Sequence, residues 1–264
     1  MAITGAILGG IAGSQFEYDR PEGLNWENCA LFSDSCEFTD DTVMSLAVKF
    51  AVDRGLDYEK AMKAIGRMYP VCGYGPKFFD WLFTDGSCAY NSFGNGAAMR
   101  VSYIGEHYSD RAVVKREAAK TAMVSHSHPE GVKGAVAVAT MIWMIRHDGA
   151  AKEDVLSYAM EEYPPDRCPF SPGRDMEYLR KNYSWDVTCM TSVPVAVRCF
   201  YESSSYESFI RNVFSLDCDS DTICAIGGGI AEEFYGLGDI DKDQILGKYL
   251  DKRLLLILKE KNDE

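Results

Sequence analysis

The sequence predicts an all-α fold, and two observations carry that prediction. Apolar residues recur at three- and four-residue steps, as in Asp41 to Arg54, where Val43, Leu46, Ala47 and Phe50 share one face of a helix. Strict alternation of apolar and polar residues, the mark of a half-buried strand, is hard to find over any useful length. At 264 residues the chain is long enough to bury a large core, and we expect one compact domain over residues 1–264.

The expected helices follow one another along the whole chain. The first, Met1 to Gly13, is apolar and rich in small residues, but Gln15, Glu17 and Asp19 follow too soon for a membrane span. It also lacks a basic start, so we expect a buried helix rather than a signal peptide. Further helices are expected at residues 41–54, 57–68, 110–124, 129–147, 152–163, 193–201, 206–214, 221–235 and 243–259. The longest irregular region is Pro164 to Asp186, and the polar end, residues 259–264, is typical of a tail.

Charge and cysteine content narrow the class of protein. The net charge of −13 argues against general binding to nucleic acids or membrane surfaces, because both are themselves anionic. The nine cysteines are scattered and form no C-x-x-C pair, so we expect free thiols in a cytoplasmic protein rather than a zinc site. No long apolar helix face stands out, which favours a monomer.

Two clusters of carboxylates and hydroxyls each begin an expected helix. One lies in Phe38 to Thr42 and the other in Asp217 to Thr222. Oxygen donors packed this closely suit Mg²⁺, Mn²⁺ or Ca²⁺. The alternative is ordinary helix capping, because Asp, Ser and Thr are preferred at helix starts. Two such clusters weaken that alternative, since adjacent carboxylates repel one another unless a cation offsets their charge.

Three further features have both a functional and a structural interpretation. The stretch from Tyr90 to Arg100 is rich in glycine and asparagine, so its backbone could cradle a phosphate or simply form a turn. His126 and His128 lie between two expected helices and could serve a site or be structural. Glu17 ends the first helix and could form a salt bridge or act as a general base.

Taken together, these segments resemble the ADP-ribosylglycohydrolase family over almost the whole chain. The resemblance rests on five segments that occur in the family's order and with its rough spacing. They are Gly5-Ala6-Ile7-Leu8-Gly9 leading to Glu17, Phe38-Thr39-Asp40-Asp41-Thr42, Gly94-Asn95-Gly96-Ala97-Ala98-Met99-Arg100, His126, and Asp219-Ser220-Asp221-Thr222. The resemblance implies a compact all-α fold and removal of ADP-ribose from a modified target.

The resemblance also implies a site with two divalent cations, Mg²⁺ or else Mn²⁺. The implied metal ligands are Thr39, Asp40, Asp41, Asp219, Asp221 and Thr222. The implied ADP-ribose contacts are Ser92, Phe93, Gly94, Asn95 and Gly96, with His126 nearby. Our hypothesis gives catalytic roles to Asp40, Asp41 and Asp219, which hold the cations, and to Glu17. Either Glu17 or an aspartate of the cluster takes a proton from the attacking water.

Two departures from the family pattern bear on activity. Many relatives have Gly-Asp where this chain has Gly9-Gly10, and Gly-Gly where it has Asp217-Cys218. These departures motivate a second hypothesis, an ADP-ribose-binding relative that has lost catalysis. The acceptor linkage is left open between serine, arginine, a nucleic acid and a small molecule. We expect the region from Pro164 to Asp186, near Trp185, to form the rim of the site.

Overall fold

The structure is a computed structural model that describes residues 1–260. It confirms the all-α prediction, and within those residues the only β-bridge is an isolated antiparallel one between Gly94 and Thr188. The helices are α1 (Ala2–Ser14), α2 (Asp40–Arg54), α3 (Tyr58–Gly66), α4 (Pro76–Phe83), α5 (Gly96–Met99), α6 (Ser102–His107), α7 (Arg111–Met123), α8 (Pro129–Asp148), α9 (Lys152–Glu162), α10 (Met176–Asn182), α11 (Cys189–Tyr201), α12 (Tyr206–Phe214), α13 (Ser220–Tyr235), α14 (Lys242–Tyr249) and α15 (Lys252–Lys259). Most of the polar end expected to be a tail, residues 261–264, lies outside the described residues.

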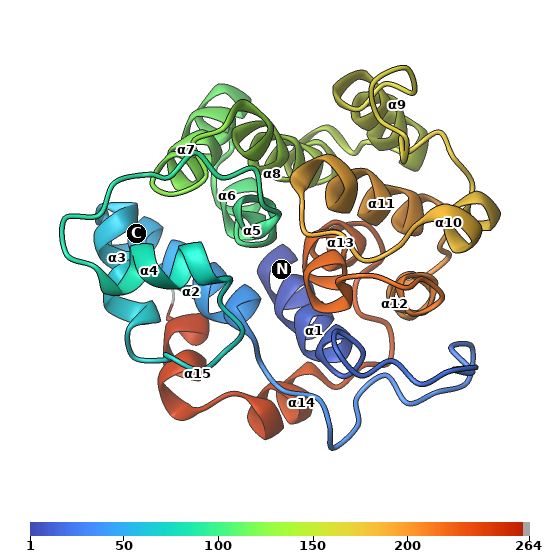
Figure 1. Ribbon diagram of the computed structural model, residues 1–264, viewed down its shortest axis with the longest axis horizontal. Helices are drawn as coiled ribbons and strands as arrows, with labels where there is room; N and C mark the ends of the chain where they lie inside the picture. Colours follow the sequence, from blue (N-terminus) through green and yellow to red (C-terminus); the bar gives the residue numbers. More distant parts are fainter. Residues whose placement is uncertain (261–264) are drawn as a thin grey trace.

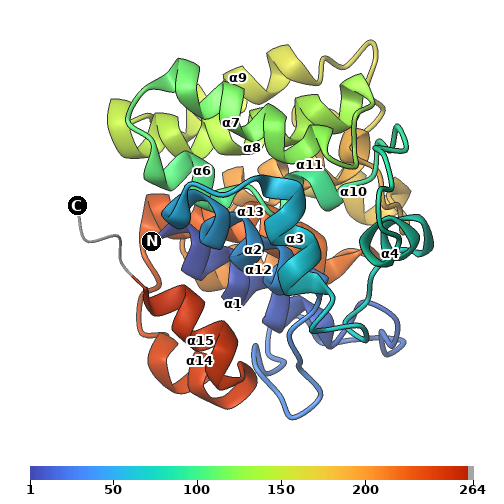
Figure 2. The same cartoon turned by 90° about the vertical axis from the view of Figure 1, so that its left-hand side faces the viewer.

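The helices form layers around α1 and α13. Figure 2 shows α7, α8 and α9 on one side of the layer that holds α1, α2, α12 and α13, with α14 and α15 on the other. Every residue of α1 from Ala2 to Gly13 is buried, as expected for a helix that is apolar on all sides. No helix among residues 1–260 combines the length and the apolar character that a membrane span requires.

The contact between α1 and α13 explains the small residues of the first helix (Figure 1). A Cβ atom at Gly9 would collide with the carbonyl of Cys224, and one at Gly13 would collide with the carbonyl of Ser220. Only glycine therefore allows the two backbones to lie this close. The helices run antiparallel, so the end of α1 lies against the start of α13, where Ser220 Oγ donates a hydrogen bond of 2.7 Å to the Gly13 carbonyl.

The start of α2 lies at the same place. A Cβ built on Gly10 would be 3.5 Å from the Cβ of Asp41, so the start of α2 packs against the small residues of α1, in contact with the start of α13. The fold thereby brings together the segment after α1, which carries Glu17, and the two acidic helix starts that lie about 180 residues apart in the sequence.

Two of the predicted helices differ in the structure, and some helices were not predicted. The expected helix 243–259 is two helices, because Leu250 is extended and Asp251 caps α15 by accepting from the amides of Arg253 and Leu254. The helix expected at 193–201 starts at Cys189 and contains Pro194. Region 164–186 is not wholly irregular, since it holds α10. The short helices α4, α5 and α6 were not predicted, because fewer than about three turns give little periodicity.

Candidate functional site

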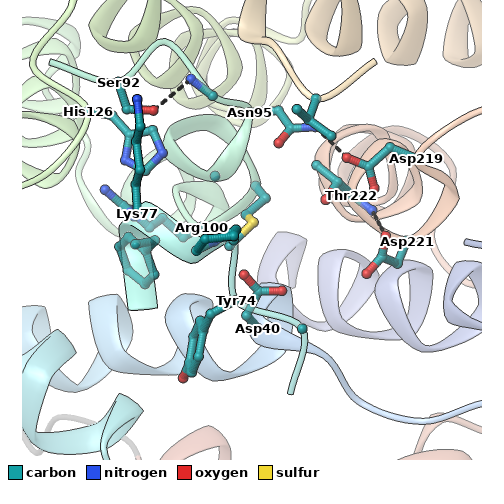
Figure 3. A pocket seen from close by; sticks show the side chains of 18 of the residues that line it. Asp40, Tyr74, Lys77, Ser92, Asn95, Arg100, His126, Asp219, Asp221 and Thr222 are labelled. Atoms are coloured by element: carbon teal, nitrogen blue, oxygen red, sulfur yellow. Dashed lines mark hydrogen bonds between the residues drawn. The ribbon is translucent and has the colours of Figure 1, made fainter. Parts of the chain in front are cut away.

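A cavity of about 570 Å³ opens beside the starts of α2 and α13. Ten of the residues predicted from the sequence line it, and they come from five separate parts of the chain. These are Glu17, Asp40, Ser92, Gly94, Asn95, Gly96, His126, Asp219, Asp221 and Thr222. In Figure 3 Asp219 and Asp221 lie at one side of the cavity and Ser92 and His126 at the other, with Arg100 and Asp40 between them.

At the start of α2, the polar side chains do not cap the helix. Thr39 is the N-cap residue in extended conformation, but its Oγ1 donates to Asp41 Oδ2 at 3.0 Å instead of receiving a backbone amide. The backbone amide of Asp40 donates to the Cys72 carbonyl at 2.6 Å. Asp41 is 1% exposed, and its Oδ1 has no hydrogen-bond partner among the described residues. A buried carboxylate oxygen without a hydrogen-bond partner indicates that a positively charged partner is missing.

At the start of α13, Asp219 and Asp221 line the cavity, and Asp221 also accepts from the backbone amide of Thr222 at 2.8 Å. Asp219 is the N-cap residue without a side-chain cap hydrogen bond, and its Oδ2 accepts from Asn95 Nδ2 at 2.7 Å. Thr222 Oγ1 donates to Asp41 Oδ2 at 3.4 Å, which joins the two helix starts. Neither N-cap residue, Thr39 or Asp219, makes a side-chain cap hydrogen bond, so ordinary capping does not account for the two acidic clusters, although Asp221 accepts from the Thr222 amide.

The carboxylates form two overlapping groups. In one group, ligand oxygens of Glu17, Asp219 and Asp221 lie within 4.8 Å of one another. In the other, oxygens of Asp40, Asp41 and Asp221 meet the same limit. Asp221 belongs to both groups, which is the arrangement expected of a carboxylate between two cation positions.

The close approach of these acids disturbs their ionisation. Burial and the charge of Asp221 raise the pKa of Glu17 to about 8 and that of Asp40 to about 8. The same two causes raise the pKa values of Asp41 and Asp219 well above their usual range. Without added positive charge the cluster therefore retains protons near neutral pH. An all-oxygen set with an orphaned buried carboxylate oxygen fits Mg²⁺ or Mn²⁺.

The glycine-rich loop is held in place by the segment before α11. The amide of Asn95 donates to the Val187 carbonyl at 2.8 Å, and the amide of Cys189 donates to the Phe93 carbonyl at 2.9 Å. The amide of Gly94 donates to Ser92 Oγ at 3.0 Å. Two amides expected to cradle a phosphate are thus already engaged, so the loop offers a ligand fewer backbone donors than the sequence suggested.

Three predicted site residues do not line the cavity. Thr39 and Asp41 are buried beneath it. Phe93 is 44% exposed and meets His128 edge-on, with ring centroids 5.3 Å apart, so its ring does not face the cavity space. Asn95 does line the cavity, but its side-chain amide is engaged with Asp219 and with Ser192 Oγ at 2.9 Å.

Several lining residues were not predicted as site residues. They are Tyr18, Tyr74, Lys77, Phe78, Tyr90 and Arg100. Arg100 ends a segment that the sequence did single out, and its position on a short buried helix turn gave no sign of the cavity. Lys77 and Phe78 lie on α4, which was itself not predicted, and Tyr74 lies just before it. The glycine- and proline-containing turn from Val71 to Pro76 is the sequence feature that could have indicated these residues.

The rim of the cavity is aromatic. Tyr18 is 75% exposed and Trp185 is 46% exposed, and their ring centroids are 6.4 Å apart. Both line the cavity, as does Val187. Of the region from Pro164 to Asp186, expected to form the rim, Trp185 alone lines this cavity.

The two departures from the family pattern lie in different surroundings. Gly10 faces Asp41, and a Cβ there would have room, so an acid at this position would join the carboxylate cluster. Asp217 is exposed and does not line the cavity, and Cys218 is buried with its Sγ 3.8 Å from the Val213 carbonyl. The missing acid at position 10 therefore bears on the site more directly than the Asp217-Cys218 pair.

Comparison with known proteins shows the family of the chain. Residues 1–257 match the ADP-ribosylglycohydrolase family, and the chain belongs to that family. It is 26% identical over 263 residues to ADP-ribosylhydrolase ARH3 of Homo sapiens, covering 77% of this chain and 72% of that protein. It is 24% identical over 309 residues to ADP-ribosylhydrolase ARH3 of Gallus gallus, covering 89% of this chain and 84% of that protein.

A solved structure shares the fold. It is described as an ADP-ribosylglycohydrolase-related protein complex, and the TM-score is 0.70 at 20% identity. The match covers 97% of this chain and 95% of the other. The helical arrangement of Figure 1 is therefore the ADP-ribosylglycohydrolase fold over nearly its full length.

Proposed function

We propose that this chain removes ADP-ribose from a modified target with the help of two divalent cations, Mg²⁺ or else Mn²⁺. The observation that carries the proposal is the pair of carboxylate groups that share Asp221, at the edge of a cavity large enough for a nucleotide. Family membership supports the hydrolase class, and the acidic cluster supports the metal dependence.

The proposed cation ligands come from the two helix starts. They are Thr39, Asp40 and Asp41 on one side and Asp219, Asp221 and Thr222 on the other. When bound, divalent cations would neutralise the clustered carboxylates and stabilise negative charge on the oxygens of the ribose and of water. The five acids Glu17, Asp40, Asp41, Asp219 and Asp221 supply enough negative charge to balance two such ions.

The reaction breaks the bond between the anomeric carbon of the ribose and the acceptor, and a water oxygen replaces the acceptor. Such a carbon develops oxocarbenium character as the acceptor leaves. Glu17 accepts the proton of the attacking water, for which its carboxylate must be ionised. Its pKa of about 8 reflects burial and Asp221, and bound cations would lower that pKa and favour the ionised form at neutral pH.

The rest of the cavity holds the ADP-ribose. Ser92 and Gly96 of the glycine-rich loop and His126 lie along the wall, and Lys77 adds a positive charge at the opening. Aromatic residues Tyr74 and Tyr90 line the same space and offer apolar surface for a base. The acceptor leaves toward the rim formed by Tyr18 and Trp185.

A second candidate is a relative that binds ADP-ribose without hydrolysing it. The observation in its favour is Gly10, which faces Asp41 and has no side chain. Many relatives in the resembled family have an acid at this position. In this case ADP-ribose binds in the presence of Mg²⁺, and no linkage is cleaved.

One experiment separates the two candidates. Release of free ADP-ribose is measured from serine-, arginine- and nucleic-acid-linked substrates and from an O-acyl ADP-ribose, each with Mg²⁺ and with a chelator. The proposed function requires release from at least one linkage that stops when the cation is removed. Binding of ADP-ribose with no release from any linkage would favour the second candidate, and neither binding nor release would contradict both.

A further inference from the structure

A buried chain of three polar side chains runs from Arg100 to His126. Arg100 is completely buried on the turn after α5, and its Nη2 donates to the Thr121 carbonyl at 2.8 Å and to Ser125 Oγ at 3.1 Å. Ser125 is also fully buried, and its Oγ lies 2.8 Å from His126 Nδ1. The resemblance to the family gave no role to Arg100 or Ser125.

The donors and acceptors in this chain fix the direction of each hydrogen bond. A guanidinium only donates, so Ser125 Oγ is the acceptor of the bond from Arg100. The hydroxyl has one hydrogen, and the remaining partner of Ser125 Oγ among the described residues is His126 Nδ1. If Nδ1 carried a proton, the buried Ser125 hydrogen would have no acceptor, which is costly. Ser125 therefore donates to Nδ1, and the imidazole proton is placed on Nε2.

The other ring nitrogen faces the glycine-rich loop. His126 Nε2 is 3.2 Å from the position of a Cβ at Gly96 and 3.4 Å from that of a Cβ at Gly94. The ring lies between Phe78 and Tyr90, with centroids 6.0 Å and 5.8 Å away, which restricts its rotation. No protein acceptor for Nε2 is found within residues 1–260, and His126 lines the cavity.

We propose that Arg100 and Ser125 are positioning residues that hold His126 as the neutral tautomer with its proton on Nε2, so that this N–H donates to the diphosphate of ADP-ribose. The identity of the ligand rests on the proposed function, whereas the tautomer rests on the hydrogen bonds alone. A fixed donor at this place compensates for the two loop amides that are engaged with Ser92 and Val187.

The electrostatic surroundings agree with a neutral ring. Burial, and then the charge of Arg100, lower the pKa of His126 well below its usual range. Burial lowers the pKa of Arg100 only to about 10, so the guanidinium keeps its charge and its donor character at neutral pH. Arg100 therefore stays a donor while His126 stays uncharged.

The tautomer is tested first, on the free protein. The chain has four histidines, so long-range ¹H–¹⁵N spectra of the imidazole nitrogens are simple enough to assign, with His126→Gln identifying the His126 signals. The expected result is a proton on Nε2 and an unprotonated Nδ1 in the wild type. Ser125→Ala should give a mixture of both tautomers. A wild-type ring with its proton on Nδ1, or a charged ring at pH 7, would overturn the inference whatever the protein hydrolyses.

The second test measures binding of ADP-ribose by titration calorimetry in buffer with Mg²⁺. Ser125→Ala is expected to weaken binding by about 3- to 10-fold, the range for one misdirected hydrogen bond. Ser102→Ala is the matched control, because Ser102, on α6, is fully buried, its Oγ has no partner among the described residues, and it does not line the cavity. It should leave the affinity unchanged.

A double variant shows whether Ser125 acts through His126. In a His126→Gln background, Ser125→Ala should have almost no further effect on affinity, because the ring that Ser125 orients is gone. An equal loss in both backgrounds would reduce Ser125 to a structural role and overturn the inference. ADP-ribose binding that is unaffected by Ser125→Ala would do the same, with the proposed function intact. A wild type that binds no ADP-ribose would contradict the proposed function and, with it, the ligand assigned to Nε2.

Discussion

The starts of α7 and α13 carry the same kind of residue and use it in opposite ways. Asp110 precedes α7, and its carboxylate accepts hydrogen bonds from the amides of Ala112 and Val113. Asp219 precedes α13, yet it makes no such bond, and its carboxylate accepts from Asn95 across the fold. An acid at a helix start therefore indicates a functional site when its side chain leaves its own helix uncapped.

The two helix starts also differ in their electrostatic surroundings. Asp110 is exposed to solvent, whereas Asp219 is buried among acids that raise its pKa. A buried carboxylate that caps no helix lowers the stability of the folded protein, and a bound cation raises that stability. A substitution at the start of α13 should therefore lower turnover, whereas one at the start of α7 should lower stability.

The largest effect is expected from Asp219→Ala. Turnover of the substrate should fall by about 10³-fold or more, because the loss of a cation ligand removes several kcal/mol of transition-state stabilisation. The thermal midpoint of the metal-free variant should not fall below that of the metal-free wild type, since one repelling buried carboxylate is gone. ADP-ribose release and thermal unfolding measure the two quantities. Full turnover by this variant would contradict the metal role of Asp219.

Asn95→Ala should have the next largest effect. Asn95 donates to Asp219, so its loss leaves that carboxylate without its orienting partner. Residues that orient metal ligands typically change metal affinity by about 10- to 100-fold. Calorimetric titration with Mn²⁺ measures this change. If the affinity for Mn²⁺ stays the same while that for ADP-ribose falls, Asn95 is a substrate contact, as the family resemblance implied.

The metal-free protein should lose stability as the pH rises from about 4 to about 8. Glu17 and Asp40 have pKa values of about 8 in the folded chain, above their values of 4.5 and 3.8 in the unfolded chain. The folded state then binds more protons than the unfolded state in this range, so the free energy of unfolding falls with increasing pH. Mg²⁺ should reduce the slope by replacing the protons. Denaturant unfolding at several pH values, with Mg²⁺ and with chelator, measures both slopes, and identical slopes would argue against a cation at the cluster.

The smallest effect on activity is expected from Asp110→Ala. This variant should lose about 1 kcal/mol of stability, the usual cost of removing a helix cap. Its turnover should stay within about twofold of the wild type, because Asp110 does not line the cavity. Urea unfolding and a turnover assay complete the comparison with Asp219→Ala. A large loss of turnover here would mean that helix stability, rather than the position of the acid, controls activity.

Much of the site could be predicted from the sequence, because its residues occur in short local patterns. Thr39, Asp40 and Asp41 lie within one turn, and Ser92 to Gly96 form one loop. The patterns could not show which side chains line the cavity: Asp41 is buried and Phe93 meets His128, so neither lines it. Arg100 lacked a role because its partners, Thr121 and Ser125, lie more than 20 residues away.

The sequence by itself determined the helices that are long enough to show periodicity, the acidic character of the two helix starts and the small residues of α1. Those properties depend on neighbours along the chain. The tertiary structure alone decided that Asp221 belongs to two carboxylate groups, that Asn95 holds Asp219, and that α4 forms a wall of the cavity. The physical reason is that these contacts join segments that are distant in the sequence and meet only when α1 packs closely on α13. The need for glycine at positions 9 and 13 likewise arises only from this packing, because a Cβ there would collide with the backbone of α13.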